Sequence, residues 1–353
     1  MIFVIASFLV CHELSLEEKV GQLLMVHFHG EEVNEEARTL VQKIKVGGIV
    51  YYNWANSLHS PEQVKALSAG LQELAEIPLL IAVDQEGGRV ARLRNGFTQF
   101  PGNKAIGETG EPQRAYDAAL TMGKEMRAVG INMNLAPVVD VNSNPCNPII
   151  GDRSFGAIPE VVALFAEQAL SGYRDAHEIA TLKHFPGHGD VDVDSHEDLP
   201  VIRKTKEELE ECELAPFAAL ASFAPAIMTA HLLVPALDRE NCCTLSEKSL
   251  SYLRDVIGFQ GVIITDSLVM KAILKTCRTV DEAAIRALQA GADVLLIGGR
   301  LLHGESAGFE MTVADVGKIH RSIVAAVKTG RISEERINTA CQRILDLKKL
   351  FQY

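Results

Sequence analysis

The sequence has no CxxC pair among its seven cysteines, and that number is odd. A chain of 353 residues buries a large core without disulfides, so we expect reduced thiols and a reducing compartment. Basic residues are fewer than acidic ones: the sequence has 34 Lys and Arg and 46 Asp and Glu, which gives a formal net charge of −12. Because an acidic surface repels phosphate backbones, we expect no nucleic acid partner.

Several motifs of phosphate and metal chemistry are also missing. There is no GxxxxGK[ST] loop, no GxGxxG after a strand and no HExxH. A calcium loop beginning at Asp190 fails, because Ser195 replaces the required glycine and Val201 replaces the bidentate glutamate. We therefore expect neither metal nor cofactor, with a zinc site of some other His/Asp spacing as the alternative.

Eight short apolar runs recur at intervals of about 25 to 50 residues, separated by segments of helical period. Runs that are apolar throughout are typical of parallel strands buried on both faces. The alternation predicts an α/β fold, a single (β/α)8 barrel of the TIM type, and an open doubly wound sheet is the alternative. The predicted strands are Leu23–Phe28, Gly48–Tyr52, Leu79–Val83, Asn132–Ala136, Ile179–Lys183, Ala226–Ala230, Val262–Thr265 and Ala292–Ile297.

Five capping signals of the form S/T-x-x-E/Q predict helix starts between these runs. The predicted first residues of the motifs are Ser15, Ser60, Thr205, Thr244 and Thr279.

The apolar opening run, Met1–Cys11, is too short to cross a bilayer. It has the length of a signal-peptide core but lacks a basic segment before it and a small-x-small cleavage site after it. We interpret 1–14 as a separate N-terminal segment and 15–353 as one catalytic barrel. We expect a cytoplasmic monomer without stable membrane association, and export or attachment to the cell envelope is the alternative.

Polar or ionisable side chains follow five of the eight predicted strands. In a barrel the carboxyl ends of the strands form one rim, and active sites lie there. One carboxylate after a strand is often only a helix cap, but five such strand ends together predict an active site. The side chains are Asp84, Asp140, Lys183 with His184, His231 and Asp266.

The segment Lys183–Asp198 contains three histidines and four aspartates. Gly187 and Gly189 predict a mobile loop after the fifth strand, which would move a side chain over a bound ligand. Asp194 and His196 are two residues apart, so their side chains are within reach of each other in a turn. A carboxylate beside an imidazole favours its charged form and makes it a proton donor near neutral pH.

Asp266 ends the buried run Val262–Thr265. A carboxylate fixed at that position can attack an anomeric carbon or stabilise positive charge on it. The sequence therefore favours glycoside chemistry over phosphate chemistry.

Four blocks of the sequence, in order, resemble the β-N-acetylhexosaminidases of glycoside hydrolase family 3, of the NagZ type. The likeness covers about residues 15 to 350. The blocks are Val83–Arg89 (VDQEGGR), Asn147–Gly156 (NPIIGDRSFG), Lys183–Asp190 (KHFPGHGD) followed by Asp194–His196 (DSH), and Thr265–Met270 (TDSLVM).

The resemblance implies roles for the candidate residues. Asp266 would be the nucleophile of a retaining hydrolase, His196 its acid/base, and Asp194 the residue that orients His196. It further implies a muropeptide substrate from which terminal N-acetylglucosamine is cleaved in cell-wall turnover. The residues implied in sugar binding are Asp84, Arg92, Arg153, Lys183, His184 and, at the rim, His231.

Three other functions stay open at this point. A phosphorylase of the same family would transfer the sugar to phosphate, which a neutral histidine does not repel. A β-glucosidase is less favoured, because two-domain relatives take their acid/base from a second domain whereas this sequence supplies Asp194 and His196 itself. A non-catalytic muropeptide-binding protein is disfavoured because Asp266 and His196 are present.

Overall fold

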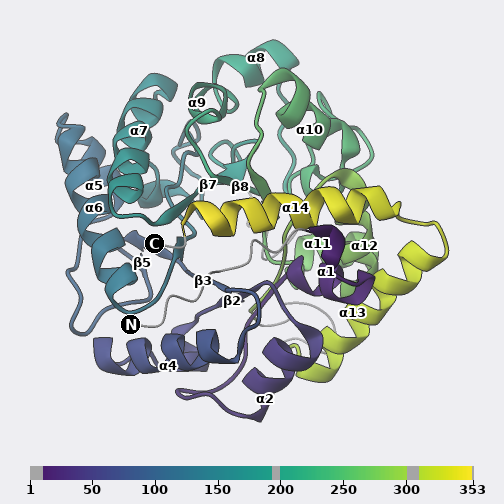
Figure 1. The fold of residues 1–353 in the computed structure, drawn as a ribbon. Coiled ribbons are helices and arrows are strands. Elements are labelled where there is room, and N and C mark those ends of the chain that lie inside the picture. The colour runs from purple at the N-terminus through teal and green to yellow at the C-terminus, as the bar shows by residue number, and fades with distance from the viewer. Residues whose placement is uncertain (1–10, 193–198, 300–309, 352–353) are drawn as a thin grey trace.

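The computed structural model describes residues 11–192, 199–299 and 310–351. Its main sheet has eight strands in the order β10-β1-β2-β3-β6-β7-β8-β9, and each paired neighbour is parallel. The two outer strands meet through a parallel bridge between Ile264 and Val294, which closes the sheet into a barrel (Figure 1). The (β/α)8 prediction is confirmed, and the open sheet is excluded by this closure.

Each predicted strand matches one observed strand, in places shortened by one to three residues at an end, and β7 extends two residues beyond the predicted end at Lys183. The strands are β1 (Leu24–Val26), β2 (Gly48–Val50), β3 (Leu80–Val83), β6 (Met133–Asn134), β7 (Ile179–Phe185), β8 (Ala226–Thr229), β9 (Val262–Thr265) and β10 (Leu295–Ile297). A short antiparallel pair, β4 (Gln85–Gly87) and β5 (Val90–Ala91), lies in the loop after β3 and was not predicted.

Helices surround the barrel and connect its strands (Figure 1). The longer ones are α4 (Pro61–Leu74), α6 (Gln113–Ala128), α7 (Pro159–Asp175), α12 (Val280–Ala290), α13 (Val313–Lys328) and α14 (Glu334–Leu350). The shorter ones are α1 (Leu16–Gln22), α2 (Glu35–Arg38), α3 (Asn53–Asn56), α5 (Asn103–Gly107), α8 (Lys206–Glu211), α9 (Ala215–Leu220), α10 (Glu247–Ser251) and α11 (Lys271–Cys277). Two π-helical segments, Thr39–Ile44 and Tyr252–Val256, and three 3-10 turns, Cys11–Glu13, Gly151–Arg153 and Cys243–Leu245, complete the described elements.

Four of the five predicted capping residues begin helices. Ser15 and Thr205 form complete capping boxes, and Ser60 and Thr279 accept a bond from the third residue of their helices. The prediction for Thr244 is wrong, because Ser246 caps α10.

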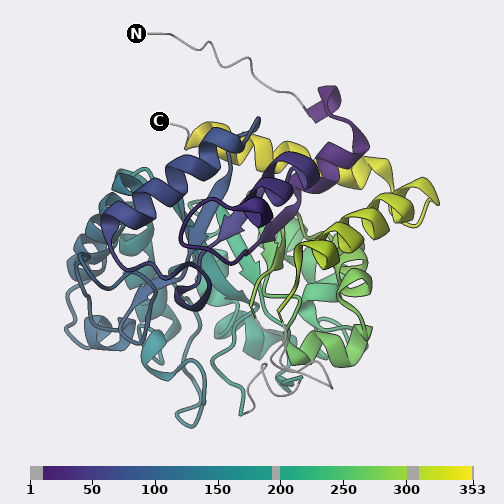
Figure 2. The same ribbon diagram turned by 90° about the horizontal axis from the view of Figure 1, so that it is seen from below.

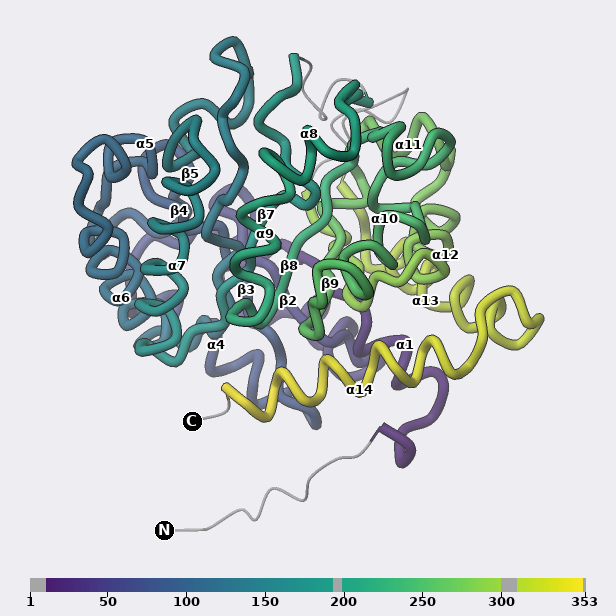
Figure 3. The backbone as a smooth tube through the Cα atoms, turned by 90° about the horizontal axis from the view of Figure 1, so that it is seen from above, coloured from purple at the N-terminus to yellow at the C-terminus, as the bar shows by residue number. Residues whose placement is uncertain are grey.

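Helix α14 crosses the end of the barrel at which the strands begin (Figures 2 and 3). Lys348 donates to Gln22, just before β1, at 2.8 Å, and Arg336 donates to Asp293, just before β10, at 2.6 Å. Because α14 closes this end, the loops that follow the strands form the rim at the other end.

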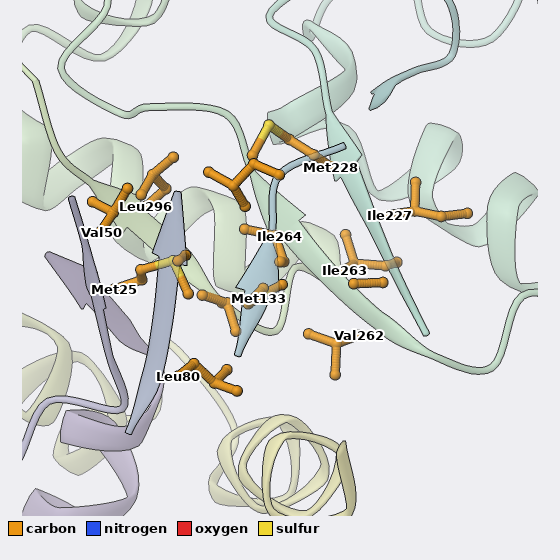
Figure 4. Packing of buried hydrophobic residues seen from close by; sticks show 14 of the residues in the cluster. Met25, Val50, Leu80, Met133, Ile227, Met228, Val262, Ile263, Ile264 and Leu296 are labelled. Atoms are coloured by element: carbon orange, nitrogen blue, oxygen red, sulfur yellow. The ribbon is translucent and has the colours of Figure 1, made fainter. Parts of the chain in front are cut away.

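The barrel interior is filled with apolar side chains, among them Met25, Leu80 and Met133 (Figure 4). Gly48 is required within this packing, because a Cβ there would lie 2.9 Å from the carbonyl oxygen of Leu80 and 3.0 Å from the Met25 methyl. The filled interior makes the barrel a packed core, so a ligand has access only at an end.

All seven cysteines lie in the described part of the chain, and none forms a disulfide. Of the predicted N-terminal segment only the part from Cys11 is described, and the Cys11 side chain is buried beside Asn338 of α14. Among the described residues, no helix has the length and hydrophobicity that crossing a membrane requires. The division at residue 14 and the cellular location stay predictions.

Candidate active site

A cavity of about 380 Å³ opens at the carboxyl ends of the strands. Its position agrees with the rule that barrel enzymes bind ligands at this end. The cavity wall includes six of the predicted site residues, which come from the ends of β3, β7 and β9 and from the loops after β3 and β6. These residues are Asp84, Arg92, Arg153, Lys183, His184 and Asp266.

The loop after β3 presents four charged side chains to the cavity, those of Asp84, Glu86, Arg89 and Arg92. Asp84 follows the strand directly, and Glu86 lies two residues further on β4. The main-chain N–H of Arg92 donates to the carbonyl of Asp84 at 3.3 Å, which folds the loop back on itself. Consequently the Arg92 guanidinium lies 3.4 Å from the Asp84 carboxylate.

Lys183, from β7, joins two carboxylates in the cavity wall. Its Nζ lies 2.9 Å from Oδ1 of Asp84 and 2.6 Å from Oε1 of Glu86. Burial lowers the pKa of Lys183, but the two carboxylates outweigh this effect and raise the pKa above its ordinary value. The ammonium group is therefore charged, although its side chain is only 2% exposed.

Arg153 completes this network from the loop after β6. Its Nε and Nη2 each donate to the carboxylate of Glu86 at 2.8 Å, a bidentate pair. Burial raises the pKa of Glu86, but Arg153 and Lys183 outweigh it and hold the pKa well below the usual range. For Asp84, Lys183 and Arg92 likewise outweigh burial and lower the pKa.

His184 is held in one orientation by two neighbours. Its Nδ1 donates to Oδ2 of Asp140 at 2.7 Å, and its Nε2 accepts from Nη2 of Arg153 at 3.3 Å. Because arginine only donates, these bonds require that Nδ1 holds the proton. Burial raises the pKa of Asp140, but His184 outweighs it and lowers the pKa, so the carboxylate stays charged.

Asp266 follows β9 and reaches the cavity wall. The main-chain N–H of Ser267 donates to Oδ1 of Asp266 at 2.7 Å, and the main-chain N–H of Asp266 donates to the carbonyl of Thr229 at 3.2 Å. These bonds fix the carboxylate between β8 and β9, where a small molecule in the cavity would meet it.

His231 differs from the expectation of a rim residue. It is completely buried and does not line the cavity. Its Nδ1 lies 2.8 Å from the Thr244 hydroxyl, and its Nε2 lies 2.9 Å from the carbonyl of Ser267. The imidazole therefore supports the backbone next to Asp266 from behind. Thr244 does not cap a helix because its hydroxyl contacts His231 and donates to the carbonyl of Ala230.

Asp194 and His196 lie outside the described residues. The described start of their loop is packed against the loop after β6, since Asn147 donates to the carbonyl of His188 at 2.8 Å. A Cβ at Gly189 would lie 1.7 Å from the carbonyl of Val141. Glycine is therefore needed here for close packing, and the predicted movement of the loop stays a prediction.

Glu86 and Tyr52 line the cavity and Asp140 holds His184, although no individual role was predicted for any of the three. Glu86 is two residues after Asp84, and in an extended segment residues i and i+2 point to the same side. This spacing could have identified Glu86 as a second carboxylate of the site. Asp140 was noticed only as a residue after a strand. Its partner His184 is 44 residues away in the sequence, so the hydrogen bond between them could not be predicted from a local pattern.

The chain matches the family model described as the glycosyl hydrolase family 3 N terminal domain over residues 15–347. It is 34% identical to the beta-hexosaminidase A of Pseudoalteromonas piscicida over 95% of this chain and 61% of that protein. It is 37% identical to a beta-hexosaminidase of Alkalilimnicola ehrlichii over 78% and 80% of the two chains.

Among solved structures, the glycoside hydrolase family 3 beta-N-acetylglucosaminidase of Paenibacillus sp. FPU-7 superposes with a TM-score of 0.90 at 45% identity. That match covers 96% of this chain and 63% of the other. This chain thus spans less than two thirds of the length of both the Paenibacillus and Pseudoalteromonas proteins. The chain belongs to glycosyl hydrolase family 3, which confirms the resemblance found in its motifs.

Proposed function

We propose that the protein is a retaining β-N-acetylhexosaminidase that removes terminal N-acetylglucosamine from the non-reducing ends of muropeptides. The observation on which the proposal rests is the position of the Asp266 carboxylate, which follows β9 and lies in the wall of a cavity at the carboxyl end of the barrel. Relatives called beta-hexosaminidase and beta-N-acetylglucosaminidase support the choice of sugar. The muropeptide aglycone rests on the family resemblance alone.

In the proposed reaction, Asp266 attacks the anomeric carbon while His196, oriented by Asp194, protonates the departing glycosidic oxygen. This step forms an ester between the sugar and Asp266 and releases the aglycone as an alcohol. His196 then removes a proton from water, which attacks the same carbon and regenerates the Asp266 carboxylate. Ser267 contributes by fixing one carboxylate oxygen through its main-chain N–H.

The charged network around Glu86 would bind the sugar. The ammonium of Lys183 has three protons, and two of them face carboxylates, which leaves one for a sugar hydroxyl. Asp84 has a lowered pKa, so its ionised carboxylate accepts bonds from sugar hydroxyls. Arg92, Arg153 and His184 complete the polar side of this cavity.

The substitution Asp266→Asn tests the proposal most directly. We expect turnover of an aryl β-N-acetylglucosaminide to fall by at least about a thousandfold, because the amide cannot form the ester intermediate. Asp255→Asn is the matched control, since that aspartate is exposed on the π-helical turn after α10. Thermal unfolding of both variants should match the parent. Turnover near the parent rate in folded Asp266→Asn would refute the nucleophile.

A phosphorylase would use the same residues, so product analysis must separate the two reactions. Purified protein is incubated with N-acetylglucosaminyl-anhydromuramoyl peptide, with and without phosphate, beside an aryl glucoside. We expect free N-acetylglucosamine in both cases and little release from the glucoside. N-acetylglucosamine-1-phosphate as the main product would replace the hydrolase by a phosphorylase, and a preference for the glucoside would replace the proposed sugar.

A further inference from the structure

A cluster of two histidines and one glutamate lies next to the active-site cavity, on the loops that follow β1 and β10. His27 and His29 follow β1, and Glu310 precedes α13. One ligand atom from each of the three side chains lies within 4.8 Å of the other two. None of these residues takes part in the proposed sugar chemistry.

The spacing of the two histidines favours a shared ligand. Residues i and i+2 of an extended segment present their side chains on the same side, and His27 and His29 have this spacing directly after a strand. Glu310 is 281 residues from His29, and the two side chains contact each other directly. The cluster therefore joins the loops after the first and last strands, where β10 pairs with β1.

His27 lacks the hydrogen bonds that a buried imidazole needs. It is only 3% exposed, and apart from an interaction with the backbone of Ile297, neither ring nitrogen has a hydrogen-bond partner among the described residues. Burial, followed by the charge of nearby His29, lowers the pKa of His27 to about 4. A buried imidazole whose ring nitrogens lack partners requires one, and a metal ion is such a partner.

We propose that His27, His29 and Glu310 bind one divalent transition-metal ion of the zinc class, with solvent as the fourth ligand. Two imidazoles and a carboxylate are a ligand set that zinc prefers, with bonds of about 2.0–2.2 Å. Four tetrahedral ligands at that distance lie within about 4 Å of one another, so the side chains need only a small adjustment. His29 is half exposed, which leaves the site open to water.

The site contacts the cavity through two aromatic rings. Trp54 packs against His27 and His29, with ring centroids 5.1 and 5.4 Å apart, and stacks on Tyr52 at 5.2 Å. Tyr52 lines the sugar cavity. Since Trp54 is the only tryptophan of the chain, its fluorescence reports on an ion at this position.

The test is a titration of the full chain with Co²⁺, after removal of metals by chelation, followed by Trp54 fluorescence and visible absorption. We expect saturable quenching at one ion per chain and the absorption of tetrahedral cobalt without a thiolate band. His29→Ala and Glu310→Gln should each weaken binding at least tenfold. His59→Ala is the matched control, because this nearby histidine is exposed and outside the cluster. His196→Ala should quench as the parent does, which separates the site from the catalytic histidine.

A second measurement does not depend on fluorescence. Zn²⁺ should raise the melting temperature of the parent by roughly 3 °C at saturation, and at the same concentration the rise should be at least halved in His29→Ala and in Glu310→Gln. Absence of quenching in the parent, or quenching that persists in both variants, would overturn the proposal. Neither result depends on whether the protein cleaves sugars, so the proposed function and the metal site can fail separately.

Discussion

The barrel has a buried ionic cluster at each end, and the two clusters differ in what their cations contact. At the amino end, the fully buried Asp293 carboxylate pairs with three arginines. Arg254 lies at 2.7 Å, Arg336 at 2.6 Å and Arg343 at 3.2 Å. At the carboxyl end, Glu86 is 2% exposed and pairs with Lys183 and Arg153. Asp293 and Glu86 are therefore similar, because each is a buried carboxylate paired with two or more cationic side chains.

Two of the three arginines at the amino end, Arg254 and Arg336, use further donors within the protein. Arg254 donates to the carbonyls of Phe259 and Gly261 at 2.9 and 2.7 Å, and Arg336 donates to that of Ala292 at 2.7 Å. These bonds attach the π-helical turn and α14 to the barrel. At the carboxyl end, Lys183 and Arg153 line the cavity instead.

The comparison shows that a buried ionic network does not by itself indicate a binding site. What distinguishes the carboxyl end is that Lys183 and Arg153 line one cavity together with the Asp266 carboxylate. Substitutions in the two clusters should accordingly have opposite profiles, affecting stability at one end and activity at the other.

The largest effect is expected for Asp293→Asn at the amino end. Without the carboxylate, three guanidinium groups face each other with no counter-charge, and we expect the free energy of unfolding to fall by about 3–5 kcal/mol. The kcat of the remaining folded protein should not change. Denaturant titration and initial rates measure the two quantities. A loss of kcat in fully folded Asp293→Asn would break the distinction between the two clusters.

Lys183→Met should have the next largest effect, with the opposite profile. We expect kcat/KM to fall by roughly a hundredfold, because a sugar hydroxyl loses a charged donor. Stability should change less than in Asp293→Asn, since Glu86 keeps its bidentate pair with Arg153. Steady-state kinetics and a melting curve check this. Unchanged kinetics would show that Lys183 is structural, as the arginines at the amino end are.

The smallest effect concerns pH. Because its pKa is lowered on folding, Glu86 adds stability that is complete above its ordinary pKa of 4.5 and is lost as the pH falls below that value. Between pH 5 and 3 we expect the parent to lose on the order of 2 kcal/mol more than Glu86→Gln. Glu111→Gln, at an exposed ion pair, is the control and should lose as much as the parent. Equal slopes in all three proteins would contradict the lowered pKa.

The positions of strands and most helix starts could be predicted because they depend on local signals. Runs such as Val262–Thr265 are apolar throughout, and Ser15 and Thr205 cap their helices with side chains only three residues away. Thr244 has the same signal as Thr205 but not the same role. Its hydroxyl is buried against β8, and that tertiary contact replaced the cap.

For the site, the sequence identified residues and the structure decided their directions. Asp84, Lys183 and Asp266 were predicted from their places at strand ends, and each lines the cavity. His231 was predicted by the same reasoning and lies behind the wall, because the orientation of one side chain after a strand depends on its neighbours. Asp194 and His196 lie outside the described residues, so their catalytic roles stay predictions.

By itself, the sequence determined the barrel class, the order of the strands and the family, since apolar period, caps and motif blocks are properties of contiguous residues. Only the tertiary structure decided which charges meet. Arg153 is 67 residues from Glu86, Ile263 and Arg336 are 30 and 43 residues from Asp293, and Glu310 is 281 residues from His29. A separation along the chain does not specify a distance in space. For His29 and Glu310, closure of the sheet brings the two residues together, because β10 pairs with β1.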